Sequence, residues 1–333
     1  MEIGYGFSLA DPAFNGVEIG RGKGNNVSNT AIGADALSSN TTGIYNTALG
    51  YVALNANTTG VNNTAVGYAV LDANTTGTNN TALGASALGA NTAGTNNTAL
   101  GYNALVVSDG SSNTAVGAST LYTNTTGGSN TAVGYSALAS NTTAVNNTAV
   151  GTDALSSSTT GASNTAIGVN AGNTLTTGSN NTLLGNSAAP SVVTVSNEIT
   201  LGNASIATLR CQVTTITALS DRRDKKDISD LPLGLDFINA LRPVKFTWAR
   251  RDGAKEGVQE AGFIAQELDE LQLAWRAEDY LDLVLKSNPE KLEAAPGKLL
   301  PILVKAIQEL SAKNAELEHR IAARETGNHK TLC

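Results

Sequence analysis

The phrase Asn63-Thr64-Ala65-Val66-Gly67 decides the fold, because near-copies of it recur along the first two-thirds of the chain. Successive copies start 17 residues apart, except for one interval of 16 residues. A fixed period of this kind is the signature of a stacked repeat architecture. The asparagines that open the ten copies are Asn29, Asn46, Asn63, Asn80, Asn97, Asn113, Asn130, Asn147, Asn164 and Asn181.

Composition within a repeat favours short strands over a helix. Glycine recurs every few residues, and each glycine costs a helix about 1 kcal/mol relative to alanine. Asn and Gly instead suit the positive-φ corners of a coil. We predict a mainly β rod, a β-roll or β-helix, in which each repeat is one rung with two short strands and two turns. Ala and Val or Leu would point inward, and Asn and Thr would stack in ladders between rungs.

Few large apolar side chains are available to each rung, so a single thin rod would bury little. This favours a fibre of three chains with the apolar face at its axis, and a monomeric β-solenoid is the alternative. The repeats resemble the heads of trimeric autotransporter adhesins and repeats found in phage tail fibres. After the tenth copy the pattern decays, and Ile199-Thr200-Leu201-Gly202 is interpreted as a last, imperfect rung.

Charge divides the chain sharply. No Lys or Arg occurs between Lys23 and Arg210, and the chain is densely charged from Arg210 onward. We therefore predict a Gly-rich leader (1–27), a repeat fibre domain (28–208), a connector (209–219) and a separate C-terminal domain (220–333). The five acidic residues of the rod are scattered, which speaks against the paired carboxylates of a glycan-degrading tailspike. They are Asp35, Asp72, Asp109, Asp153 and Glu198.

Several partners and cofactors are not expected. The net charge of −7 argues against a nucleic-acid or anionic-membrane partner. No apolar run approaches the roughly 18 residues of a membrane span, and the first ten residues lack the features of a signal peptide. Cys211 and Cys333 are interpreted as free thiols. We expect no metal and no cofactor.

The charged junction at residues 219–225, Leu-Ser-Asp-Arg-Arg-Asp-Lys, is the candidate for chemistry. On charge alone it would be a solvated interdomain loop. A serine hydroxyl is a weak nucleophile that needs a base, and a lysine can serve when burial or like charge disfavours its protonated form. Ser220 and Lys225 are five residues apart, so they would cooperate across a turn or between chains rather than on one helix face. His319 and His329 are too distant for a Ser-His-Asp triad.

Four motifs in order resemble the intramolecular chaperone domain found at the C-terminus of phage endosialidases and many tail fibres. The motifs are Ser-Asp-x-Arg-x-Lys at 220–225, Leu-x-Pro-Val-x-Phe-x-Trp at 241–248, Gly-Phe-Ile-Ala-Gln-Glu at 262–267 and a closing helix from 299 to 310. Two departures are Asp227, where the family usually has Asn, and 294–296, where a Val-x-Tyr strand is expected.

The resemblance implies a small α+β chaperone domain that cleaves its own chain once, between Leu219 and Ser220. It also implies that Ser220 is the nucleophile and Lys225 the base of a Ser-Lys dyad, with no activity on external substrates. The residues expected to support them are Asp221, Arg223, Gln266 and Glu267.

Apolar residues in the closing helix (299–325) are spaced 3,4,3,4, which is typical of a coiled coil. Asn314 is a polar core residue that would fix the register. Sequence rules alone favour two strands, the resemblance implies three, and we predict three; the alternative is an amphipathic helix packed on its own domain. The expected core is Leu300, Leu303, Ile307, Leu310, Asn314, Leu317 and Ile321.

Together these features predict a phage tail fibre protein for host attachment, made in the host cytoplasm and carried on the virion. Its C-terminal domain would drive homotrimer assembly and then release itself. A host cell-surface receptor and an upstream tail or fibre protein are the expected further partners. The alternative is a bacterial trimeric surface adhesin carrying the same self-cleaving chaperone.

Overall fold

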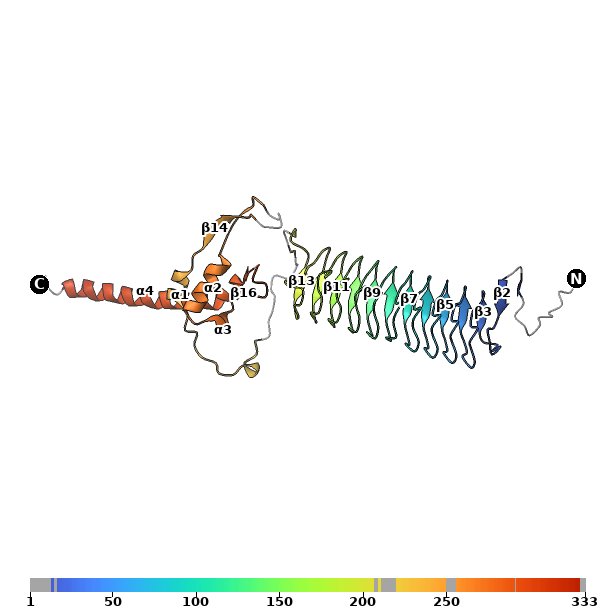
Figure 1. The fold of residues 1–333 in the computed structure, drawn as a ribbon. Helices are drawn as coiled ribbons and strands as arrows, with labels where there is room; N and C mark the ends of the chain where they lie inside the picture. Colours follow the sequence, from blue (N-terminus) through green and yellow to red (C-terminus); the bar gives the residue numbers. More distant parts are fainter. Residues whose placement is uncertain are drawn as a thin grey trace. The chain divides into compact units, whose positions relative to one another are not determined.

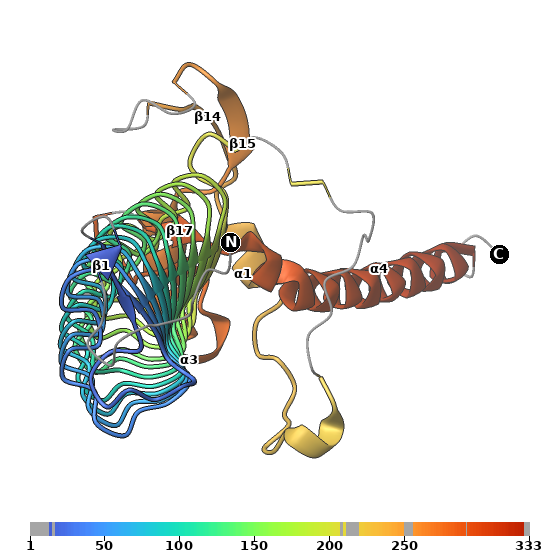
Figure 2. The same ribbon diagram turned by 90° about the vertical axis from the view of Figure 1, so that its right-hand side faces the viewer.

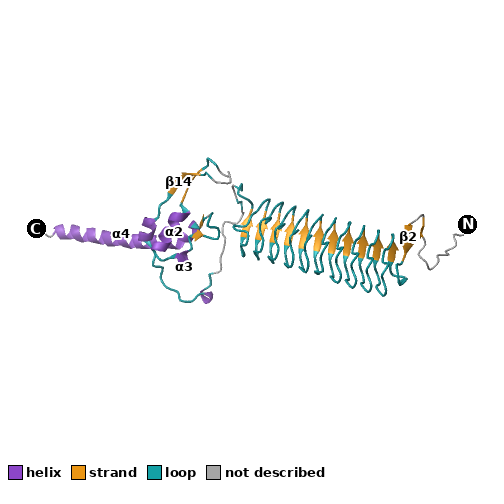
Figure 3. Cartoon of the chain, in the orientation of Figure 1, coloured by secondary structure: helices purple, strands orange, loops and turns teal. Residues whose placement is uncertain are grey.

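A computed structural model describes residues 13–14, 17–206, 209–210, 220–249, 256–290 and 292–329. The chain divides into two compact units, Met1–Ile206 and Ala207–Cys333. The first is a β-solenoid and the second combines helices with short strands (Figures 1 and 3). Cys211, Leu219 and Cys333 lie outside the described residues.

The solenoid is a ladder of parallel strands from β3 to β13, one strand from each coil (Figure 1). Equivalent residues pair in register, so that Thr64 lies opposite Thr81 and Ala65 opposite Ala82. Two strands precede the ladder and pair antiparallel, β1 (Ala13–Phe14) with β2 (Val17–Gly20) and β2 with β3. The parallel strands are β3 (Thr30–Ile32), β4 (Thr47–Leu49), β5 (Thr64–Val66), β6 (Thr81–Leu83), β7 (Thr98–Leu100), β8 (Thr114–Val116), β9 (Thr131–Val133), β10 (Thr148–Val150), β11 (Thr165–Ile167), β12 (Thr182–Leu184) and β13 (Ile199–Leu201).

The predicted stack of one rung per repeat is confirmed, including the imperfect last rung, which forms β13. The prediction of two strands per rung is wrong, because each repeat contains one three-residue strand and otherwise turns. Figure 2 shows the coils nearly end on, each superimposed on the next with a small rotation. A second strand does not form because the second apolar run enters the left-handed region: Ala69 has φ 48° and Leu71 has φ 50°.

The interior of a typical coil is filled by one strand alanine and by the apolar pair of the turn, which is Val70 and Leu71 in the coil that contains β5. In the coil that contains β5, Ala65 and Leu71 are fully buried, and the equivalent residues form a contiguous core along the solenoid. The strand valine does not point inward as predicted. Because side chains alternate along a strand, burying Ala65 turns Thr64 and Val66 outward, where Thr64 is exposed and Val66 half-buried.

Buried asparagines form the predicted ladders. In the first ladder, Asn80 Oδ1 accepts a hydrogen bond from the backbone N–H of Asn97 at 3.0 Å, and Asn80 Nδ2 donates to the carbonyl of Gly94 at 2.9 Å. In the second ladder, Asn91 Nδ2 donates to Asn74 Oδ1 at 2.8 Å in the preceding coil. Both ladders combine the two kinds of bond, since Asn63 Nδ2 also donates to Asn46 Oδ1 at 3.2 Å and Asn91 Nδ2 also donates to the carbonyl of Gly94 at 3.3 Å.

Glycines in the coil serve two different purposes. Gly67 has φ +138°, a conformation that only glycine adopts readily. Gly77, in the Asn-Thr-Thr-Gly turn, is not at positive φ but is needed for space. A Cβ there would lie 2.2 Å from Asn74 Oδ1 and 2.6 Å from the carbonyl oxygen of Gly94 in the next coil. The predicted positive-φ corners thus fall at residues such as Gly67, Leu71 and Asn79 instead.

Two departures from the repeat pattern are compensated by contacts between successive coils. In the 16-residue repeat, the carboxylate of Asp109 takes the place of a missing turn carbonyl and accepts from the backbone N–H groups of Thr92 and Ala93 at 2.6 and 3.1 Å. Further along, Gly172 replaces the core leucine, and Leu183 replaces a core alanine. The Leu183 side chain occupies the adjacent space, since a Cβ on Gly172 would lie 3.3 Å from it.

The C-terminal unit is built around a small core at the base of a long helix. Phe237, Leu283 and Ile302 are fully buried at its centre. Strands β14 and β15 form an antiparallel hairpin. A short strand, β17, does form at the start of the 294–296 segment that departs from the family motif, and it pairs antiparallel with β16. The elements are η1 (Arg222–Asp224), α1 (Leu235–Ala240), β14 (Val244–Thr247), β15 (Gln259–Gly262), α2 (Ala265–Ala274), α3 (Glu278–Leu281), β16 (Val284–Leu285), β17 (Glu293–Ala294), η2 (Pro296–Leu299) and α4 (Leu300–His329).

Helix α4 has two apolar faces. Ile302 and Ala306 are buried against the unit's own core, where α4 contacts α1. The predicted coiled-coil residues lie on another face and are exposed, among them Leu303 at 40% and Ile307 at 66%. The packing of α4 on its own domain therefore uses a different set of residues from the 3,4 pattern.

Candidate functional site

A single turn of 3₁₀-helix, η1, brings the two ends of the charged junction together. Asp221 caps this turn, and its Oδ1 accepts the backbone N–H of Arg223 at 2.9 Å. On the far side of the turn, Lys225 Nζ donates to Ser220 Oγ at 2.6 Å. The structure thus places the two residues in contact across a turn, which is one of the two arrangements open to a Ser–Lys pair five residues apart.

Asp221 and Arg223 form an ion pair that stabilises this turn. Arg223 Nη2 donates to Asp221 Oδ2 at 2.6 Å, and Arg223 Nε reaches both carboxylate oxygens at 3.1 Å. Hydrogen bonds from the Arg223 side chain, and then from its backbone, lower the pKa of Asp221. Because the pair is at the surface, its contribution to stability is small, but it holds the turn in the shape that joins Ser220 to Lys225.

The junction is open to solvent. Ser220 and residues 222–230 are exposed, and Asp221 is half-buried. A general base must accept a proton, whereas Lys225 Nζ is the donor in its bond to Ser220 Oγ. Contact between the serine and the lysine is therefore present, whereas the dry surroundings that favour a neutral amine are not supplied by the described part of this single chain.

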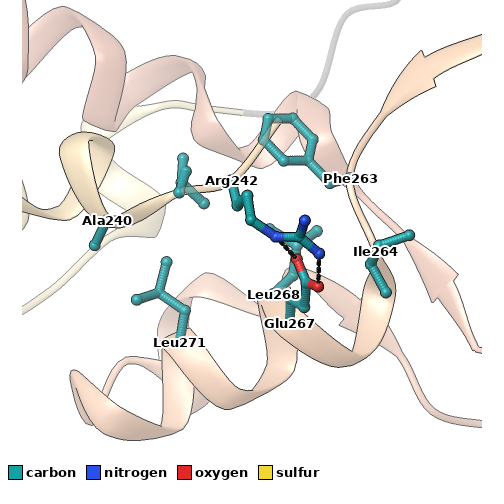
Figure 4. Close-up of a pocket in the computed structure, with 8 residues that line it drawn as sticks. Ala240, Arg242, Phe263, Ile264, Glu267, Leu268 and Leu271 are labelled. Carbon is teal, nitrogen blue, oxygen red and sulfur yellow. Dashed lines mark hydrogen bonds and ion pairs between the residues drawn. The ribbon is translucent and has the colours of Figure 1, made fainter. Parts of the chain in front are cut away.

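Gln266 and Glu267 lie at the start of α2, and Glu267 pairs with Arg242 (Figure 4). Arg242 Nε donates to Glu267 Oε2 at 2.9 Å, and Nη2 bonds the other carboxylate oxygen. These bonds lower the pKa of Glu267. Arg242 and Glu267 share a small pocket with apolar side chains, whose full lining is Ala240, Leu241, Arg242, Phe263, Ile264, Glu267, Leu268 and Leu271.

Within the described residues, no hydrogen bond or ion pair joins Gln266 or Glu267 to Ser220 or Lys225. The expected supporting residues thus fall into two groups, with Asp221 and Arg223 at the serine and Glu267 in the pocket. Sequence reasoning missed Arg242, the partner of Glu267. Its only signal was its place inside the Leu-x-Pro-Val motif, between Leu241 and Pro243.

Comparison with known proteins matches the segment that contains this turn. Residues 220–274 match the family model described as chaperone of endosialidase, from Ser220 to the end of α2. No curated protein and no solved structure matches the chain. No helix in the described ranges combines the length and hydrophobicity needed to cross a membrane. A stacked β-solenoid followed by a segment similar to this self-cleaving chaperone family fits a tail fibre with a C-terminal intramolecular chaperone.

Proposed function

We propose that this tail fibre-like chain is a phage tail fibre protein whose C-terminal unit assembles a homotrimer and then removes itself by cutting between Leu219 and Ser220. The mature fibre would stay on the virion and attach to a host-cell receptor. The observation that supports the cut is the 2.6 Å hydrogen bond between Lys225 Nζ and Ser220 Oγ, at the first residues of the family match.

The proposed reaction starts with Ser220 Oγ attacking the carbonyl carbon of Leu219. Lys225 Nζ, in its neutral form, accepts the hydroxyl proton. The C–N bond between Leu219 and Ser220 then breaks, and the departing Ser220 nitrogen takes a proton, which leaves an ester on Ser220 Oγ. Water hydrolyses this ester, giving a carboxylate on Leu219 and a free hydroxyl on Ser220. Each chain is cut once.

Assembly is expected to precede cleavage, because the exposed amine must first lose water. Removing a cation from water favours its neutral form, and chains that gather around the junction would do this. Helix α4 supports such assembly, because its 3,4 apolar edge is free for partners: Leu300 is 65% exposed and Ile321 is 56% exposed. Apolar side chains at such spacing are buried in coiled coils.

The solenoid offers a second surface for the trimer. The third residue of every strand from β3 to β13 is Ile, Leu or Val, and it points outward. Leu49 is 43% exposed, Leu83 is 48% exposed and Ile167 is 46% exposed. A continuous apolar stripe of this kind marks an interaction surface. We assign it to the fibre axis, where the same stripe of two further chains would cover it.

The test compares wild-type protein with three variants by denaturing gel, intact mass and size in solution. We expect wild type to yield fragments 1–219 and 220–333, and Ser220→Ala to give an uncut trimer. Lys225→Arg keeps the charge but cannot act as a base, so it should also stay uncut, while the neighbouring Lys226→Arg should cleave normally. Cleavage of Ser220→Ala at the same bond would overturn the mechanism, and a wild-type monomer would overturn the assembly.

A further inference from the structure

Glu309, on α4, holds the backbone where the junction segment enters the folded unit. Its Oε2 accepts the backbone N–H of Leu235 at 2.8 Å, across 74 residues of sequence. The carboxylate also covers Gly234 so closely that a Cβ on Gly234 would lie 2.3 and 2.4 Å from the two carboxylate oxygens. A side chain at 234 would therefore displace the Glu309 carboxylate.

Helix α1 depends on this contact because it has no cap of its own. Gly234 is its N-cap residue and has no side chain with which to accept a hydrogen bond. The first N–H groups of a helix have no partner within the helix and need one from elsewhere. Glu309 supplies that partner to Leu235, so the start of α1 is fixed by the closing helix.

The same contact lies two residues beyond Leu233, the first buried residue downstream of the Ser220–Lys225 turn. Residues 222–230 are exposed, Leu231 is half-buried, and Leu233 is 2% exposed. The position of the turn relative to α4 is therefore determined at residues 233–235. Glu309 lies on α4 between Ile307 and Leu310, two residues of the exposed 3,4 edge. One side chain thus connects the helix expected to assemble with the segment expected to be cut.

We propose that Glu309 is a positioning residue for self-cleavage. Its bond to Leu235 fixes the downstream end of the junction to α4, so that the Ser220–Lys225 turn takes its place against partner chains when α4 assembles. Without that bond only the packing of Leu231 and Leu233 on the core holds this end of the junction, and the reactive geometry is sampled less often. This inference rests on the proposed cleavage, and it adds a link between assembly and reaction.

The test measures the first-order rate at which the full chain is cut, within the assembled fraction separated by size after cell-free synthesis. We expect Glu309→Ala to slow cleavage about 10- to 100-fold, the range that misplacement of a reacting group produces. Glu309→Gln keeps an oxygen that accepts the Leu235 N–H and should restore most of the rate. The matched control is Glu316→Ala, one heptad further along α4 and exposed, which should cleave at the wild-type rate.

A second variant reaches the same contact without touching α4. Gly234→Ala places a Cβ against the Glu309 carboxylate and should slow cleavage by a similar factor. In the double variant, the two effects should overlap rather than multiply, because both remove one interaction. Assembled Glu309→Ala or Gly234→Ala that is cut at the wild-type rate would overturn the proposal, as would effects that multiply. Uncut wild-type protein would instead overturn the proposed cleavage itself.

Discussion

Replacing Asn80 by alanine removes one residue of the ladder that joins successive coils to each other. The Asn80 side chain is fully buried and makes two bonds to backbone groups, accepting from the Asn97 N–H at 3.0 Å and donating to the Gly94 carbonyl at 2.9 Å. Both of those backbone groups lie in buried residues. Asn80→Ala therefore leaves the buried Asn97 N–H without a partner, whereas the Gly94 carbonyl still accepts from Asn91 Nδ2 at 3.3 Å.

The magnitude follows from the Asn97 N–H. A buried polar group left without a partner costs about 1–3 kcal/mol, so Asn80→Ala should destabilise the solenoid locally by about 1–3 kcal/mol. Total stabilities of ordinary domains are only about 5–15 kcal/mol. In a stacked repeat, stability depends on contacts between neighbours, so we expect the coils on either side of Asn80 to open together while distant coils stay closed.

Native-state hydrogen exchange on full-length protein measures this effect one amide at a time. The Asn97 amide should lose most of its protection in Asn80→Ala, and protection should recover within a few coils in each direction. The control is Thr76→Ala in the same turn region, where the side chain is exposed. Equal protection of Asn97 in wild type and Asn80→Ala would refute the conclusion that the ladder carries this share of the stability.

Two further predictions concern single coils. Gly60→Ala should destabilise the solenoid by about 1–3 kcal/mol through overpacking, because the added Cβ would lie 2.5 Å from the Gly77 carbonyl oxygen. Thermal unfolding measures this loss. The control is Gly297→Ala, which should be neutral because its Cβ would have no atom within 4 Å. Burial raises the pKa of Asp109, but hydrogen bonds from Thr92 outweigh it, so the folded pKa is lowered. Asp109 therefore stabilises the fold above its unfolded pKa of about 3.9, and this contribution is lost as pH falls through the folded pKa. Asp109→Asn should cost at most about 1 kcal/mol at pH 7, since the group is exposed. The stabilities of the two proteins should converge as pH falls from the unfolded pKa through the lowered folded pKa of Asp109; a difference that stays constant with pH over this range would contradict this assignment.

Much of the solenoid was predictable because a strict period forces one conformation on every repeat. Once Asn63 and Asn80 occupy equivalent positions, stacking and ladders follow. The phase of the strand was not predictable. An alternation over three residues is equally consistent with Ala65 inside or with Thr64 and Val66 inside. Only the complete coil shows that the interior accommodates the small side chain of Ala65.

That each coil has only one strand could not be predicted from the sequence, for a different reason. Leu71 adopts φ 50°, a region that costs a residue other than glycine about 1–2 kcal/mol. Local propensity therefore argues against this conformation, and full burial of the leucine side chain offsets its cost. The sequence showed an apolar pair and no sign that the backbone would turn there.

The candidate site divides in the same way between local and distant contacts. Ser220 and Lys225 are close in sequence, so one turn could bring them together, and the motif identified them. The Arg242–Glu267 pair spans 25 residues and the Glu309–Leu235 bond spans 74. Contacts at such separations depend on how α1, α2 and α4 pack, which no local pattern in these segments specifies.

A repeat fibre has a register problem that its own rungs cannot solve. In a trimer, a chain displaced by one rung would meet the same stripe of Ile, Leu and Val, so it would lose about one rung of contact in ten. Only local departures such as Asp109 and Gly172 distinguish the two registers. In the proposed coiled coil, by contrast, a slip of one heptad would set Asn314 against Ile307 or Ile321 of a partner. A buried amide without a partner costs about 1–3 kcal/mol. Asn314 therefore distinguishes the correct register from a shifted one, which the near-identical rungs do not. Alignment by α4 before the rungs associate, followed by removal of α4, would leave the fibre in the correct register with no easy path back to free chains.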